Sequence, residues 1–284
     1  MNEICPQTHA GSICPTLELA VMAAQAAGTV IQAGANDLAV IERKGVGDLV
    51  SEVDREADRV ACQVLSETSD LPILSEELNA QQNISDDMWI VDPLDASSAF
   101  LMSAGPSYPA VLIALRQGGQ TTVGVTYFPL TGEWFYAKRG RGAWQDGKRL
   151  VCDSNESLSD VWVEMNQYGD AEYETPFFTR LRSQLRSRSG CQLVTSNVPY
   201  SGVAMRIAAG ESSLAVAVHD NNPSNTKQAS WDIAAPQIIM EEAGGVFLTP
   251  EGGPVDPFAS RPIIVSRSKQ LAMEVVALNS KQTI

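Results

Sequence analysis

The chain has 284 residues and is strongly acidic, with 34 Asp and Glu residues against 20 Lys and Arg and a formal net charge of −14. Binding to nucleic-acid polymers and to anionic membrane surfaces relies on Lys and Arg, so this charge balance argues against both kinds of partner. Hydrophobic residues make up 44% of the chain, which is enough for one large core or two modest ones.

The cysteines and the apolar N-terminal stretch bear on the cellular compartment. The five cysteines are odd in number and widely spread, and no CxxC pair occurs, as is typical of a reduced intracellular protein. Residues 17–31 are apolar, but no Lys or Arg precedes Arg43, so the basic region of a secretory signal is missing. No apolar run reaches transmembrane length. We therefore expect a cytoplasmic protein.

Hydrophobic periodicity predicts alternating helices and strands. Pro15 and Thr16 suit the start of the first helix, and Gly118-Gly119 is typical of a hairpin turn. In chain order we expect a helix at 17–31, a helix from about 54 with Ala57, Val60, Ala61, Val64 and Leu65 buried, and strands at 72–74, 110–115, 121–127 and 133–137, followed by a helix at 173–187, a strand at 193–195, a helix at 202–209 and a strand at 213–218.

The last predicted helix carries an acidic residue near its start. Ser230 is a favourable N-cap, which would place Asp232 in the first turn of a helix that ends at Gly244-Gly245. A carboxylate there lies at the positive end of the helix dipole.

The most informative segment joins an apolar strand to a pair of aspartates. Residues 89–91 are apolar, Asp92 and Asp95 follow around a proline, and Ser97 and Ser98 come next. Two carboxylates at a strand exit can converge on one point, and Mg²⁺ needs such clustered oxygens. The hydroxyls and free backbone N–H groups that follow suit a phosphate ester. The segment therefore indicates a metal-dependent phosphate site.

Further acidic residues stand at the ends of other predicted elements: Glu76 and Glu77 after one strand and Asp232 at a helix start. Each alone is more often a cap or a solvated charge. Together with Asp92 and Asp95 they make the cluster that a site for two or three ions requires, with ions about 3.5–4 Å apart. So many carboxylates share a small volume only when cations neutralise them or some are protonated.

Four spaced motifs resemble the inositol monophosphatase family, the Mg²⁺-dependent, lithium-sensitive phosphomonoesterases. They lie at 48–54, 73–77, 89–100 and 231–235, the last followed by 242–245, so the resemblance covers nearly the whole chain. It implies an α/β fold of the layered α+β sandwich type, with alternating layers of helices and mixed sheets. It also implies a two-part chain and a homodimer. A change from β-rich to alternating texture near residue 150 places the division, with 1–150 carrying most metal ligands and 151–284 completing the site.

The resemblance also implies ligands for the ions. Glu76, Asp92 and the Leu94 carbonyl would hold the first Mg²⁺, while Asp92, Asp95 and Asp232 would hold the second. Glu76 would help to place a weaker third ion. Glu77 would lie beyond the ligands or be a plain surface charge.

Catalytic and substrate-binding roles follow from the same resemblance. Backbone N–H groups of Ala96 and Ser97 would bind phosphate oxygens, with Ser98 as a further substrate contact. Tyr200, in a segment that departs from the family pattern, is a candidate substrate contact that could equally fill space. Ser97, paired with Asp54, would orient and deprotonate the attacking water, and Glu76 would assist in catalysis. The metal ions would lower the pKa of that water and stabilise charge on the phosphate.

The chain departs from the family pattern at the phosphate loop. The family usually has Gly-Thr-Thr-Asn where this chain has Ala96-Ser97-Ser98-Ala99. Serine keeps the hydroxyl that the water-activating pair needs, and Ala96 is tolerable if its backbone φ is negative. Lys44 lies one residue away from the spacing of the family's upstream lysine.

The residues expected to line the substrate differ from the family pattern more strongly than the phosphate loop does. A Gly-Thr-Ala-Ala-type segment is replaced by Val198-Pro199-Tyr200-Ser201, and an acidic position by Asn225. We therefore predict hydrolysis of a small phosphorylated metabolite but leave its identity open between an inositol phosphate, a 3′-phosphonucleotide, histidinol phosphate and a sugar phosphate. A relative that binds such metabolites without turning them over is the alternative of a different class.

Overall fold

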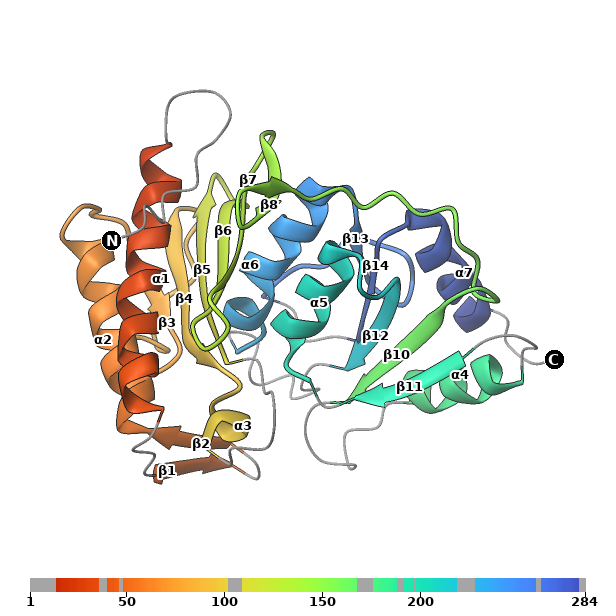
Figure 1. The fold of residues 1–284 in the computed structure, drawn as a ribbon, viewed down its shortest axis with the longest axis horizontal. Coiled ribbons are helices and arrows are strands. Elements are labelled where there is room, and N and C mark those ends of the chain that lie inside the picture. The colour runs from red at the N-terminus through yellow and green to blue at the C-terminus, as the bar shows by residue number, and fades with distance from the viewer. Residues whose placement is uncertain are drawn as a thin grey trace.

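The computed structural model describes residues 14–35, 40–45, 48–101, 109–167, 176–187, 192–196, 198–218, 228–258 and 262–280. Two large sheets alternate with layers of helices (Figure 1). This layered α/β architecture confirms the predicted fold class.

The first large sheet has seven strands in the order β3-β4-β5-β6-β7-β8-β9. They are β3 (Ile73–Ser75), β4 (Met88–Asp95), β5 (Ala110–Gln117), β6 (Gln120–Phe128), β7 (Glu133–Lys138), β8 (Gly142–Gln145) and β9 (Lys148–Arg149). Only β3 and β4 pair in parallel, and all other neighbours are antiparallel. The turn from β5 to β6 is the predicted Gly118-Gly119 pair, whose positive φ angles of 56° and 78° suit a hairpin.

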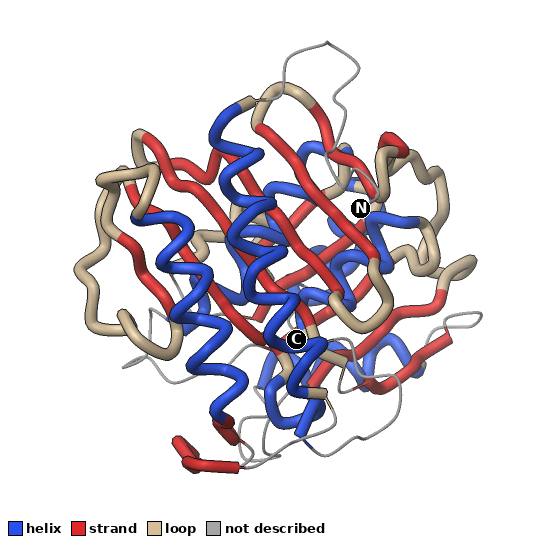
Figure 2. The backbone as a smooth tube through the Cα atoms, turned by 60° about the vertical axis from the view of Figure 1, so that its left-hand side comes forward, coloured by secondary structure: helices blue, strands red, loops and turns tan. Residues whose placement is uncertain are grey.

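Helices α1 (Pro15–Gly34) and α2 (Glu52–Ser66) cover one face of this sheet, and in Figure 2 they cross in front of its strands. The stripe predicted for α2 is partly wrong, because Val60 and Val64 are only half-buried while Val53 and Asp58 are buried. A small two-stranded sheet, β1 (Val40–Gly45) with β2 (Asp48–Ser51), leads into α2.

The second large sheet has five strands in the order β11-β10-β12-β14-β13. They are β10 (Trp162–Gln167), β11 (Gln192–Ser196), β12 (Leu214–Val218), β13 (Val246–Leu248) and β14 (Pro262–Ser266). Helices α4 (Pro176–Arg186) and α7 (Lys269–Ser280) pack on its outer face, and α5 (Tyr200–Ala209) and α6 (Gln228–Ala243) form the layer between the sheets. The expected helix at 173–187 is thus seen from Pro176, and residues 173–175 lie outside the described part of the chain.

Close packing of α6 on the first sheet places its residues next to β4 and β5. Gly124 of β6 makes this possible, since a Cβ atom there would lie 2.8 Å from the carbonyl oxygen of Ala235. The helix ends before Gly244, as predicted, and this glycine has a φ of 95°. The predicted N-cap is wrong, because α6 already includes Gln228 and Ser230 therefore lies inside the helix.

The division near residue 150 stays a proposal. The seven-stranded sheet uses residues 73–149 and the five-stranded sheet residues 162–266. However, α6 comes from the second half of the chain and packs on the first sheet, so the two halves share one core.

Candidate metal and phosphate site

Two carboxylates at the end of β4 lie close together because the pairing of β4 with β5 is irregular between them. Residues three apart on a regular strand face opposite sides of the sheet. Here Asp92 pairs with Leu112 and Asp95 with Ala110, so three steps on β4 oppose two on β5 and the register shifts between them. Such a bulge returns the second side chain to the face of the first. This explains how Asp92 and Asp95 point to the same place.

Asp232 of α6 completes a trio with Asp92 and Asp95. Carboxylate oxygens of the three residues lie within 4.8 Å of one another. Asp92 is almost fully buried, with 1% of its surface exposed, while the other two are half-buried. We refer to these three residues as the carboxylate trio.

The electrostatics of the trio favour a bound cation. Burial, together with the charges of Glu76, Asp95 and Asp232, raises the pKa of Asp92 well above its ordinary value. Each factor penalises the ionised form, so the trio is costly unless Asp92 is protonated or a cation neutralises the group. Hard oxygen donors that converge in this way fit Mg²⁺.

Two other predicted ligands lie beside the trio. Glu76 follows β3, its N–H group donates to the Val91 carbonyl at 3.2 Å, and its charge contributes to the raised pKa of Asp92. The Leu94 carbonyl accepts a hydrogen bond from the Ser97 hydroxyl at 2.8 Å, while the Leu94 N–H group donates to Asp92 at 3.1 Å. The structure thus brings Asp92, Asp95 and Asp232 together, with Glu76 near enough for its charge to act on Asp92.

The loop after the trio turns into the short helix α3 (Ser97–Leu101) at a single residue. Ala96 has a φ of 74°, so the condition under which alanine is tolerable at this position, a negative φ, is not met. A left-handed conformation is the one that glycine adopts without steric cost. The chain must reverse from β4 into α3 between Asp95 and Ser97, and Ala96 bears the strain of this turn. Ser98 lies in α3, but its side chain is outside the described part.

Asp54 lies fully buried in the first turn of α2, but its partner differs from the prediction. It accepts hydrogen bonds from the N–H group of Ser51, at 2.8 Å, and from the Ser51 hydroxyl, and its own N–H group donates to the Ser51 hydroxyl oxygen at 3.4 Å. The two bonds donated by backbone N–H groups form a capping box. Its Oδ1 atom has no hydrogen-bond partner among the described residues. Because the Ser97 hydroxyl donates to Leu94 instead, the predicted Ser97–Asp54 pair is not formed.

The first turn of α5 borders the trio from the other half of the chain. Ser201 is fully buried, and its hydroxyl donates a hydrogen bond to Oδ2 of Asp95. Burial and the nearby charge of Asp232 raise the pKa of Tyr200 well above its usual value. The Tyr200 ring packs edge-on against Phe247, with centroids 5.9 Å apart. Tyr200 was predicted, whereas Ser201 was not, because it lies 106 residues from its partner.

A family model described as the inositol monophosphatase family matches residues 14–283. The chain belongs to the inositol monophosphatase family. A fructose-1,6-bisphosphatase/inositol-1-monophosphatase of Aquifex aeolicus is 30% identical over 81% of this chain and 84% of its own length. Inositol monophosphatase 2 of Solanum lycopersicum is 31% identical over 86% of this chain and 91% of its own length.

A solved structure agrees with the sequence relatives. The extragenic suppressor protein SuhB of Bartonella henselae superposes with a TM-score of 0.79 at 25% identity, over 95% of this chain and all of that one. Inositol monophosphatase family members are Mg²⁺-dependent phosphatases, so the prediction of a phosphoric monoester hydrolase is confirmed at the level of the family.

Two predictions drawn from the family pattern fall outside the described residues. Asn225, expected at the substrate wall, is not described, and neither is the side chain of Lys44. Among the helices in the described part of this family member, none is both long and apolar enough to cross a membrane.

Proposed function

We propose that this protein hydrolyses a small phosphate monoester with Mg²⁺ held by the carboxylate trio. The observation that carries the proposal is the convergence of Asp92, Asp95 and Asp232 within 4.8 Å, with one of the three almost fully buried. Glu76 and the Leu94 carbonyl complete the ligand set for two or three ions. Bound Mg²⁺ supplies a lowered pKa for the attacking water and stabilisation of charge on the phosphate.

The remaining roles fall on the chain's own groups. Backbone N–H groups of Ala96 and Ser97 hold the phosphate oxygens, and Ser98 and Tyr200 border the substrate. Asp54 offers the buried Oδ1 atom as a proton acceptor, because this atom has no other partner among the described residues. The Ser97 hydroxyl turns from the Leu94 carbonyl toward the attacking water.

The substrate class is a small phosphorylated metabolite. Support for a substrate other than inositol phosphate comes from Tyr200 and Ser201, which fill the place of small residues of the family beside the trio. A 3′-phosphonucleotide, histidinol phosphate and a sugar phosphate are the candidates. A cytoplasmic homodimer that is inhibited by Li⁺ is the proposed form of the enzyme.

Phosphate release from a panel of inositol, sugar, nucleotide and histidinol phosphates, with and without Mg²⁺, tests this function. We expect Mg²⁺-dependent turnover of one compound well above the others, and nearly complete loss of it in Asp95→Asn. Mg²⁺ binding without turnover of any compound would instead support a relative that binds phosphorylated metabolites. Activity retained in Asp95→Asn would contradict the metal assignment.

A further inference from the structure

A polar cavity lies at the other end of α6 from the carboxylate trio. Its volume is about 310 Å³, and its wall comes from the β5–β6 turn, Arg139 after β7, the second half of α6 and residues 255–257. Glu241 follows Asp232 by nine residues, about 13 Å along the helix. Arg116 pairs with Met88, at the opposite end of β4 from Asp92. The cavity is therefore separate from the proposed catalytic site.

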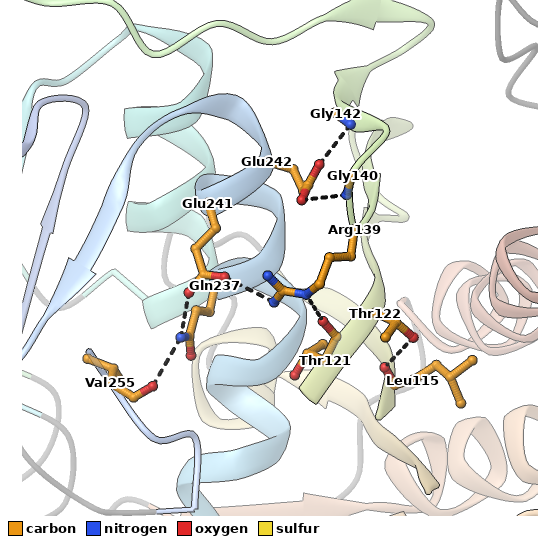
Figure 3. A network of polar contacts seen from close by, with 10 residues as sticks. All are labelled: Leu115, Thr121, Thr122, Arg139, Gly140, Gly142, Gln237, Glu241, Glu242 and Val255. Atoms are coloured by element: carbon orange, nitrogen blue, oxygen red, sulfur yellow. Dashed lines mark hydrogen bonds and ion pairs between the residues drawn. The ribbon is translucent and has the colours of Figure 1, made fainter. Parts of the chain in front are cut away.

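Arg139 is held in the wall of this cavity by two hydrogen bonds (Figure 3). Its Nε atom donates to the Thr121 carbonyl at 2.7 Å, and its Nη2 atom donates to Glu241 at 3.1 Å. Because both bonds use one side of the guanidinium group, the group is fixed in place. Its Nη1 atom makes no hydrogen bond to the described residues and remains a donor for a ligand.

Arg116 contributes a second guanidinium group that is poorly neutralised. It lies over the Phe258 ring, 4.9 Å from the centroid, and only 17% of its side chain is exposed. It forms an ion pair with Asp86 at 3.9 Å, but Asp86 is 81% exposed, so the pair contributes little. The Arg116 Nε atom has no hydrogen-bond partner within the described part of the chain. A largely buried cation of this kind is costly without an anion beside it.

The wall also contains an acceptor that lacks a partner. Gln237 is 9% exposed, and its amide nitrogen donates to Glu241 at 2.8 Å and to the Val255 carbonyl at 3.1 Å. Its Oε1 atom accepts nothing from the described residues.

Both oxygens of Glu241 already accept hydrogen bonds, one from Gln237 and one from Arg139. Asp256 is the second carboxylate of the wall, and its Oδ1 atom accepts a hydrogen bond from the Phe258 N–H group at 3.0 Å. The cavity thus combines two arginines, two carboxylates that already accept hydrogen bonds, and one amide acceptor without a partner among the described residues.

We propose that this cavity binds a small hydroxy acid, with its carboxylate on Arg116 and Arg139 and its hydroxyl on Gln237. Arginine pairs favourably with carboxylates through parallel N–H donors, which makes it the suitable residue type for the anionic end. The Oε1 atom of Gln237 is buried and has no partner among the described residues, so a ligand hydroxyl that reaches it through a small shift of the wall satisfies an otherwise unpaired acceptor. A volume of about 310 Å³ is at the lower end of the range for small-molecule sites, which suits a small metabolite.

Calorimetric titration of the full-length protein with L-malate tests the proposal, and EDTA is included so that no metal ion brings the anion to the trio. We expect saturable binding at one site. Arg116→Gln and Arg139→Gln should each weaken it at least tenfold, since each removes a charge-assisted bond. Arg141→Gln is the matched control, because Arg141 is exposed and lies outside the wall of the cavity. Asp95→Asn should bind malate like the wild type, which separates this site from the proposed catalytic one.

Succinate has the same carboxylates without the hydroxyl and tests the role of Gln237. We expect it to bind severalfold more weakly than L-malate. Arg139 is surface-exposed, so its variant should fold, and a thermal melt checks this. Absence of saturable malate binding, or equal binding by wild type and both arginine variants, overturns the site. Equal affinities for malate and succinate overturn the assignment of Gln237.

Discussion

The hydroxyl of Ser201, in the first turn of α5, donates a hydrogen bond to Oδ2 of Asp95 at the end of β4. Ser201 is fully buried, so water does not compete for this bond. One oxygen of Asp95 is thereby held in position by the second half of the chain. Groups that orient a metal ligand in this way typically change metal affinity 10- to 100-fold when they are removed.

Ser201→Ala should therefore raise the Mg²⁺ concentration that gives half-maximal binding about tenfold or more. Calorimetric titration with Mg²⁺ measures this directly, and turnover at saturating Mg²⁺ should recover in large part. A urea denaturation without Mg²⁺ separates the effect from a general loss of stability. Unchanged Mg²⁺ affinity in a folded variant would show that Ser201 does not position Asp95.

The left-handed backbone of Ala96 predicts that two substitutions differ in their effect on stability. Ala96→Gly should keep the free energy of unfolding within about 1 kcal/mol, since glycine adopts this φ without strain but adds disorder to the unfolded chain. Ala96→Val should lower it by about 2 kcal/mol or more, because a β-branched residue at φ 74° is strained and Ala96 is buried. Urea denaturation compares the two, and equal stabilities would argue against the strained turn.

The raised pKa of Asp92 predicts how the stability of the metal-free protein depends on pH. Between the ordinary carboxyl pKa of about 4 and the raised folded value, the folded state binds more protons than the unfolded state. The free energy of unfolding contributed by this group therefore falls as the pH rises through that window. Urea denaturation at several pH values with EDTA should show the fall, and Asp92→Asn should reduce it.

Mg²⁺ provides the complementary test of Asp92. Because the ion needs an ionised ligand, its binding should release protons. The heat of Mg²⁺ binding should then vary with the ionisation enthalpy of the buffer, and the variation should shrink in Asp92→Asn. A binding heat that is the same in every buffer would argue that Asp92 is already ionised.

Cys14 is predicted to be the most reactive thiol among the described cysteines. Partial burial raises its pKa, but hydrogen bonds with Lys138 and Thr16 outweigh this and bring the pKa to about 7. Burial and the charge of Asp58 instead raise the pKa of Cys62 to about 12. Since the thiolate is the nucleophile, iodoacetamide at pH 7 should label Cys14 well before Cys62.

Mass spectrometry of the digested protein follows this labelling, and Lys138→Met is the matched variant. It should slow labelling of Cys14, because the thiolate loses its nearest cation, while Cys62 stays unchanged. Equal labelling rates for Cys14 in the wild type and in this variant would contradict the pairing.

Local patterns were sufficient to predict much of the fold and the acidic part of the site. Helix α1, the Gly118-Gly119 hairpin and the acidic exit of β4 each depend on neighbours within a few residues. Asp232 was singled out as an acidic residue at a predicted helix start, and the family motifs then gave it a role as a ligand. It approaches β4 only through the packing of α6 on the first sheet.

Features that depend on distant parts of the chain or on exact backbone angles were missed. The bond between Ser201 and Asp95 joins two elements 106 residues apart, and no local pattern marks it. The positive φ of Ala96 arises because the chain must reverse between a fixed strand and α3. The capping role of Ser51 was different, since Ser51 and Asp54 have the spacing of a capping box, and the sequence contained this signal.

The two hydrogen bonds from Ser51 to Asp54 allow stability and catalysis to be separated at one carboxylate. Ser51→Ala removes the N-cap of α2 and should lower the free energy of unfolding by about 1–2 kcal/mol. Its turnover should change little, because Asp54 keeps the Oδ1 atom proposed to accept a proton. Asp54→Asn removes this acceptor and should lower kcat about 100-fold or more.

Both variants are compared by urea denaturation and by turnover at saturating Mg²⁺ and substrate. The expected pattern is a loss mainly of stability in Ser51→Ala and a loss mainly of kcat in Asp54→Asn. An Asp54→Asn enzyme with nearly wild-type kcat would mean that Asp54 serves only the helix cap. The proton of the attacking water would then pass to another group of the site, and Glu76, whose charge already acts on Asp92, would be the next carboxylate to replace.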